Sequence, residues 1–130
     1  MTSELYPAAT RDLTRMRREL APGPDGAFNE FGKAVFADGA LPTKTKHVIA
    51  VAVAHVTQCP YCIRGHTRAA LREGATNHEL MEAIWVAAEM RAGAAFAHSI
   101  IALDEMGELG SAATNDHRQH SVAMGEHHGH

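Results

Sequence analysis

Apolar positions recur along most of this chain with the three- and four-residue spacing that is typical of helices. Residues 1–21 predict a helical lead-in with a stripe of leucine and methionine side chains. The run Pro-Gly-Pro-Asp-Gly at residues 22–26 is typical of a break. Helical spacing resumes over residues 27–37, where phenylalanine and valine fall on one broad face. The first third of the chain therefore predicts two helices with a break between them.

Residues 43–57 form the most apolar segment, and their second half alternates valine, isoleucine and alanine. The valines would also suit a buried strand. The length of the segment and its alanines favour a buried helix, and no other segment reads as a strand that could pair with it. The sequence therefore predicts an all-α fold.

Helix boundaries are marked further along the chain. Cys59-Pro60 is typical of a helix start, because proline is favoured in the first helical turn. Gly74 is a cap for the C-terminal end of that helix. Thr76 and Glu79 have the spacing of a capping box, which predicts another helix start. This last helix has Leu80, Ile84, Ala87 and Ala88 on its apolar face.

The chain of 130 residues fits one domain of ordinary size. We expect a helical lead-in over residues 1–26, a compact helical domain over residues 27–107 and a polar tail over residues 108–130.

Histidine-rich segments can bind nickel, copper or zinc, but a solvated tail is the simpler interpretation. The tail histidines are His117, His120, His127, His128 and His130.

Composition excludes several function classes. The net charge is −3 and no basic block is present, which argues against a nucleic-acid partner. No apolar run reaches the roughly 18 residues of a membrane span, and the N-terminus lacks the pattern of a secretory signal. We therefore expect a cytoplasmic protein that does not bind a membrane. No flavin, haem or nucleotide motif is visible, so no cofactor is expected.

The segment Cys59-Pro60-Tyr61-Cys62-Ile63-Arg64-Gly65-His66 carries the candidate chemistry. At a helix start, Cys59, Cys62 and His66 lie on one face, because they are three and four residues apart. Unpaired N–H groups and the helix dipole favour a thiolate there, and His66 can exchange a proton with Cys62. These are the parts of a thiol peroxidase. A thiolate reduces a small hydroperoxide, a disulfide forms, and a dithiol or protein reductant resets the pair.

Two other interpretations of this segment stay open. Both cysteines could be small buried core residues, with an incidental histidine nearby. Alternatively Cys59, Cys62, His66 and one further histidine would make a Cys₂His₂ zinc set. Three ligands within eight residues leave little loop for a tetrahedral cage, and common zinc patterns separate their ligand pairs by a dozen or more residues.

The Cys-x-x-Cys-x-x-x-His segment and its surroundings over residues 41–103 resemble the alkylhydroperoxidase D-like branch of the carboxymuconolactone decarboxylase-like superfamily. The resemblance implies an all-α fold, assembly into homotrimers or homohexamers, and peroxide reduction by the cysteine pair. It implies that Cys62 attacks the peroxide, Cys59 resolves the intermediate, and His66 belongs to a proton relay. The namesake decarboxylases generally lack the cysteine pair, so a cofactor-free decarboxylase or isomerase is the less favoured alternative.

The sequence departs from that branch at two relay positions. A glutamate commonly lies twelve residues before the first cysteine, and here that residue is His47. A histidine can pass a proton, but it cannot hold the negative charge that would steady a protonated His66. Tyr61 takes the place of a histidine in the best-known member, and it is a poor base. His55 is the nearest substitute in the sequence, and Glu89 is a candidate for the missing carboxylate.

Overall fold

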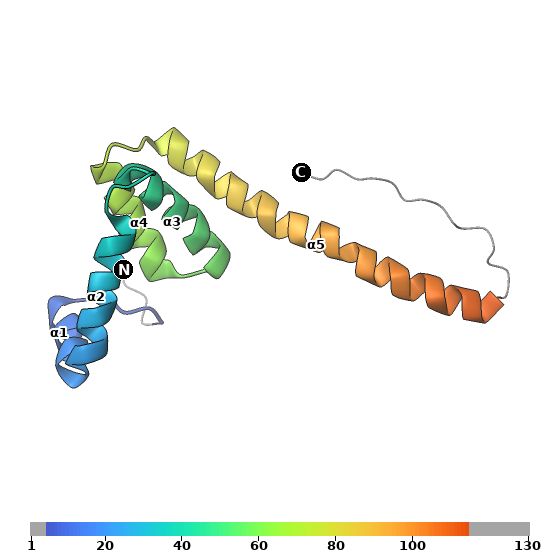
Figure 1. Ribbon diagram of the computed structural model, residues 1–130, viewed down its shortest axis with the longest axis horizontal. Helices are drawn as coiled ribbons and strands as arrows, with labels where there is room; N and C mark the ends of the chain where they lie inside the picture. The colour runs from blue at the N-terminus through green and yellow to red at the C-terminus, as the bar shows by residue number, and fades with distance from the viewer. Residues whose placement is uncertain (1–4, 115–130) are drawn as a thin grey trace. The chain divides into compact units, whose positions relative to one another are not determined.

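The computed structural model describes residues 5–114, and every regular element in that range is a helix (Figure 1). The prediction of an all-α fold is confirmed. The predicted helix over residues 43–57 is also confirmed, with both boundaries where the sequence placed them. The helices are α1 (Arg11–Leu20), α2 (Pro22–Phe36), α3 (Thr43–Thr57), α4 (Pro60–Arg72) and α5 (Asn77–Thr114).

The chain divides into two compact units, Met1–Met90 and Arg91–His130. Helices α1 to α4 and the first part of α5 belong to the former, and the rest of α5 belongs to the latter. Helix α5 continues through Gly107, where the sequence suggested that a polar tail begins. Glutamate, leucine and alanine follow that glycine, and they are strong helix formers. The five tail histidines lie outside the described residues.

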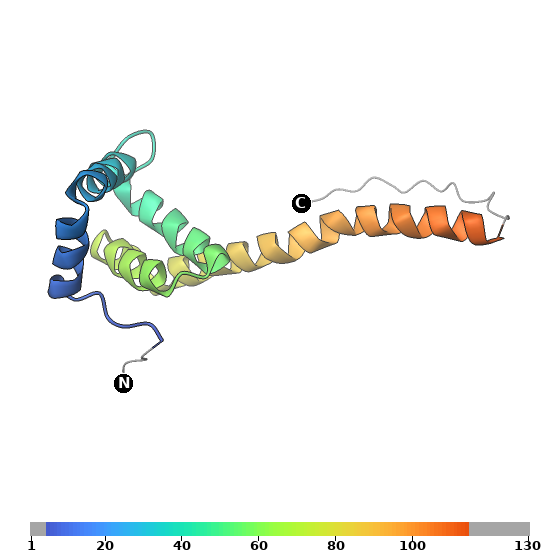
Figure 2. The ribbon, with the colours of Figure 1, turned by 90° about the horizontal axis from the view of Figure 1, so that it is seen from below.

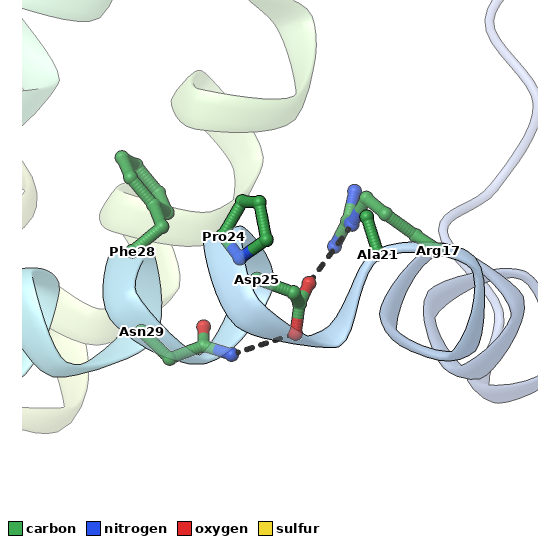
Figure 3. Close-up of a pocket in the computed structure, with 6 residues that line it drawn as sticks. All are labelled: Arg17, Ala21, Pro24, Asp25, Phe28 and Asn29. Atoms are coloured by element: carbon green, nitrogen blue, oxygen red, sulfur yellow. Dashed lines mark hydrogen bonds and ion pairs between the residues drawn. The ribbon is translucent and has the colours of Figure 1, made fainter.

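The junction between α1 and α2 differs from the expectation of a break over residues 22–26. Only Ala21 separates the two helices, and Pro22 opens α2 at a position where its missing N–H is not needed. Asp25 in the first turn of α2 lies 3.7 Å from the guanidinium of Arg17 (Figure 3). It also lies 3.7 Å from the guanidinium of Arg18. The Asp25 side chain is 13% exposed, so these ion pairs are partly shielded and link the two helices.

Helices α3 and α4 lie side by side and bury the core of the first unit (Figures 1 and 2). Val51 of α3 and Ala70 of α4 are completely buried, and Ala75 and Leu80 complete the cluster. The small alanines let the helix backbones approach closely. Val48 and Ile84 pack against this cluster from its edge. The packing fixes the face that α3 and α4 present to each other.

The turn between α4 and α5 has the predicted caps. Gly74 adopts a φ of +100°, a conformation that costs glycine little and other residues more. The N–H of Thr76 donates to Glu79 Oε1 at 2.9 Å, and the N–H of Glu79 donates to Thr76 Oγ1 at 3.0 Å. This capping box fixes the first turn of α5, so that Leu80 enters the core.

Candidate functional site

The cysteine pair lies at the start of α4, as predicted. Cys59 is the N-cap, and Pro60 is the first helical residue. The Cys59 sulfur accepts a hydrogen bond from the backbone N–H of Cys62, with a distance of 3.2 Å. Both cysteines are free thiols and both are partly buried. An N–H group that has no partner within the helix therefore points at the Cys59 sulfur, and this setting stabilises a thiolate.

The two thiols differ in acidity because they interact with each other. Hydrogen bonds from the Cys62 side chain and the Cys62 N–H lower the pKa of Cys59 below its ordinary value. The same thiol–thiol hydrogen bond, together with burial, raises the pKa of Cys62. Of the two thiols, Cys59 is therefore the one that loses its proton first.

The two helices bring His47 and His66 together. Nδ1 of His47, on α3, lies 3.1 Å from Nδ1 of His66, on α4. A hydrogen bond between two imidazole nitrogens needs one N–H donor and one lone pair, so the two rings share a single Nδ1 proton. The sequence proposed both residues for a proton relay, but their direct hydrogen bond follows from the packing of α3 on α4.

Phe36 is a part of this site that the sequence did not single out. It is the last residue of α2, and its ring stacks on His47 with centroids 4.5 Å apart and planes at 10°. The same ring stacks on His66, with centroids 5.0 Å apart and planes at 24°. In the sequence Phe36 was only one of several apolar residues on a helix face, and no spacing rule connects it to either histidine.

The environment of His47 favours its neutral form. Burial is the main cause that lowers the pKa of His47, and the adjacent His66 lowers it further. Of the charged residues near the end of α4, Glu73 raises this pKa and Arg72 lowers it, both by smaller amounts. The neutral His47 ring has a nitrogen lone pair that can accept a proton.

His55 lies apart from the two paired histidines. Its Nδ1 donates to the Val51 carbonyl of its own helix at 2.7 Å, which leaves Nε2 as the acceptor in the neutral ring. His55 also lines a groove of about 440 Å³, together with Gln58, Pro60 and Arg64. Two of these residues, Gln58 and Pro60, flank Cys59 in the sequence, but neither cysteine is among the residues that line the groove.

Tyr61, between the two cysteines, contacts the N-terminal segment. Its hydroxyl donates to the Pro7 carbonyl at 2.7 Å, and its ring meets that of Tyr6 edge-on at 6.2 Å. The hydroxyl is therefore engaged with a backbone carbonyl 54 residues away. Tyr61 links residues 6–7 to the start of α4.

The structure does not support the candidate metal ligands, and it leaves the candidate carboxylate Glu89 exposed. Within residues 5–114, no group of three or more histidine, cysteine, aspartate or glutamate side chains is arranged to hold a metal ion. The proposed set of Cys59, Cys62, His66 and another histidine is therefore not assembled there. Glu89 is exposed on α5.

Comparisons with known proteins agree with this fold. Residues 22–105 match the sequence profile of the Carboxymuconolactone decarboxylase family. A Paracoccus denitrificans protein named Uncharacterized protein 4 in cox locus is 65% identical over 88 residues, which cover 68% of this chain and 79% of that protein.

Solved structures show the same similarity. A carboxymuconolactone decarboxylase family protein from Legionella pneumophila is 37% identical, with a TM-score of 0.57 over 62% of this chain and 75% of that one. A Thermotoga maritima protein of the same family, whose description suggests a role in the antioxidative response, is 28% identical. Its TM-score is 0.50 over 71% of this chain and 95% of that one. The chain therefore belongs to the carboxymuconolactone decarboxylase family.

Proposed function

We propose that this protein is a dithiol peroxidase of the alkylhydroperoxidase D-like kind, which reduces small hydroperoxides through Cys59 and Cys62. The observation that carries the proposal is the hydrogen bonding of the two sulfurs at the start of α4. Cys59 accepts from the Cys62 N–H at 3.2 Å, and the pKa of Cys59 is lowered. Two cysteines that serve only as small apolar core residues would not need this polarisation.

The reaction balances with the two thiols and one peroxide. A thiolate attacks the outer oxygen of the hydroperoxide, so an S–O bond forms, the O–O bond breaks, and the released alkoxide takes a proton to become an alcohol. The second sulfur then attacks the sulfenic acid, an S–S bond forms, and water leaves. A dithiol or protein reductant returns the disulfide to two thiols.

The order of the two sulfurs is a separate part of the proposal. Resemblance to the alkylhydroperoxidase D-like branch assigns the attack to Cys62 and the resolution to Cys59. The raised pKa of Cys62 favours its protonated form, so a base must remove that proton before Cys62 attacks. His66 lies one helical turn beyond Cys62 on the same helix, and a bridging water can carry the proton to it. The relay of His66 and His47 then serves to remove the proton from Cys62.

Single cysteine variants test both the function and the order. We expect Cys62→Ser to abolish peroxide consumption, and Cys59→Ser to accumulate a sulfenic acid on Cys62 that a dimedone probe captures. A sulfenic acid on Cys59 in the Cys62→Ser protein would show instead that the stabilised thiolate is also the attacking sulfur. Full activity in both variants would contradict the peroxidase proposal.

Two rival functions make different demands on the same residues. A cofactor-free decarboxylase or isomerase would retain its activity when both cysteines are replaced by serine. A zinc protein would retain stoichiometric metal after removal of residues 115–130. The Thermotoga relative with a suggested antioxidative role favours the peroxidase. A reducing compartment such as the cytoplasm suits a thiol pair that must be reduced again after each turnover.

We also propose that the protein is a homo-oligomer, a trimer or a hexamer, whose contacts include α5. Large apolar side chains are exposed along most of this helix, and exposed apolar surface of this extent marks an interaction site. The side chains are those of Met81, Trp85, Val86, Met90, Phe96, Ile100, Ile101, Leu103, Met106 and Leu109.

A membrane is a poorer match for this helix than a second copy of the chain. Over Asn77–Gly110 α5 is long and apolar enough to cross a bilayer by length and composition alone. However, Glu89 and Arg91 lie near its middle. A charged residue at the centre of a bilayer costs about 2.5–3.5 kcal/mol on insertion scales. Ionic groups at a protein interface can instead be paired or remain at a solvated rim.

A further inference from the structure

The rings of His47, His66 and Phe36 form one stacked group, which we call the three-ring cluster. Each of the three helices α2, α3 and α4 supplies one ring. The two imidazoles hydrogen-bond through Nδ1 at 3.1 Å, and the phenyl ring lies against both of them. All three residues are partly buried.

Phe36 is held in place by the segment that follows it. The Phe36 carbonyl accepts a hydrogen bond from the Thr43 hydroxyl at 2.7 Å, and the Asp38 carboxylate accepts from the Thr43 N–H at 2.8 Å. The Ala37 carbonyl accepts from the Lys46 ammonium at 2.6 Å. These bonds tie the end of α2 to the first turn of α3, one turn before His47. They therefore fix the backbone that carries the phenyl ring, and the ring itself stacks on both imidazoles.

The hydrogen bond limits how many protons the histidine pair can hold. One Nδ1 donates and the other accepts, so the neutral pair carries one proton between the two facing nitrogens. A first added proton can enter at an outer nitrogen and keep this bond. A second would protonate both facing nitrogens, put two N–H groups against each other and break the bond. The pair therefore takes up one extra proton easily and a second only with difficulty.

The surroundings of the cluster do not relieve that limit. Phe36, which α2 contributes, is uncharged. At the end of α4, Glu73 and Arg72 act on His47 in opposite directions. Among the residues that the structure describes, no carboxylate hydrogen-bonds to either imidazole ring. The group that stacks on both imidazoles is thus an uncharged ring, which does not stabilise a doubly protonated state as a carboxylate would.

We propose that Phe36 is a positioning residue, which holds His47 and His66 in contact so that they act as one relay with a capacity for a single added proton. The catalytic consequence rests on the proposed peroxidase function, in which the relay removes the Cys62 proton. In that role, the pair accepts the thiol proton as its one added proton and later releases it to the alkoxide. A substitution at Phe36 then changes proton uptake by the histidines without touching either sulfur.

The test follows the imidazole nitrogens of the reduced full chain by two-dimensional ¹H–¹⁵N NMR as the pH is lowered. His47→Gln and His66→Gln variants assign the signals. In the wild-type protein we expect two uptake steps separated by at least about one pH unit, because the two sites interact. In Phe36→Leu we expect the two steps to converge by about one pH unit or more.

Phe31→Leu is the matched control, because Phe31 lies on the same helix, is 63% exposed and pairs with Phe28 instead. We expect it to titrate like the wild type, and Phe36→Tyr to restore the two separated steps. Unchanged steps in Phe36→Leu, or equal changes in Phe31→Leu, would overturn the proposal. If Phe36→Leu does not fold, the same comparison is made with Phe36→Met.

The titration needs no peroxide, so it separates this inference from the peroxidase proposal. If the thiols fail to react with peroxide while the Phe36 variants shift the titration as described, the paired histidines stand and the peroxidase function falls. If the thiols react and the titration is unchanged, the peroxidase function stands and the positioning role of Phe36 falls.

Discussion

Helices α3 and α4 differ from most of α5 in how far their large apolar side chains are exposed. In the first pair Val51 and Ala70 are completely buried, and the paired histidines have a hydrogen-bond partner and a stacked ring within the chain. Along α5, large apolar side chains such as Trp85 and Ile100 are 69% and 60% exposed. The candidate site is thus built within one chain, while α5 still has apolar surface to bury.

This difference suggests that α3 and α4 determine the chemistry of the site and that α5 determines assembly. Substitutions in the site should change chemistry and proton uptake in a chain that keeps its assembly. Substitutions of the exposed apolar side chains of α5 should change assembly, because these side chains lie outside the core cluster. Three predictions test that separation, from the largest expected effect to the smallest.

The largest effect is expected from charges on α5. In the double variant Ile100→Glu and Leu103→Glu, an interface between copies would have to bury two carboxylates, each at a cost of several kcal/mol. We expect the wild-type protein to be a trimer or hexamer of 14.0 kDa chains and the double variant to be monomeric. Size-exclusion chromatography with light scattering measures the molar mass.

Glu105→Lys is the control for that experiment, since it changes charge on the same helix without replacing an apolar side chain. It should keep the assembly. A wild-type monomer, or a double variant that assembles normally, would show that α5 is not the contact surface.

The next effect concerns the relay in the site. We expect His66→Ala to slow peroxide reduction near neutral pH by about a hundredfold, because general base catalysis contributes roughly that much or more. His78→Ala, at an exposed position in the first turn of α5, should react at the wild-type rate. Stopped-flow measurement of thiol oxidation gives the rate as a function of pH. An unchanged pH–rate profile in His66→Ala would remove His66 from the relay.

The smallest effect is on stability. Because burial lowers the pKa of His47 in the folded chain, the unfolded chain binds more protons as pH falls through the ordinary histidine range. His47 therefore contributes stability that is present above its unfolded pKa and is lost as the pH falls toward the lowered folded value. We expect His47→Gln to flatten this acid-side decline in the free energy of unfolding, measured by urea titration at several pH values. His98→Gln, at an exposed position, should leave the slope unchanged.

The sequence predicted the local features of this fold well. Cys59 at the N-cap, the capping box at Thr76 and the helix over residues 43–57 all depend on neighbouring residues, which a sequence displays directly. The start of α2 was placed five residues too late, because proline and glycine suggest a break. Here Pro22 opens a helix whose first turn is held by Asp25.

The site was only partly predictable, for a physical reason. Spacing along a helix connects Cys59, Cys62 and His66, but the contact between His47 and His66 depends on how two helices pack. Phe36 enters from a third helix, and Tyr61 reaches a backbone carbonyl that no side-chain pattern reveals. Residue types therefore indicated the chemistry, and tertiary packing decided which residues act together.

The central claim is that Cys59 and Cys62 form a redox pair, and one measurement tests it most directly. Fully reduced, metal-free protein receives one equivalent of an organic hydroperoxide, and mass spectrometry follows the free thiols and the Cys59–Cys62 disulfide over time. We expect rapid loss of two thiols and formation of that disulfide. Thiols that stay reduced for hours would contradict it, while leaving the helical fold and the paired histidines unchanged.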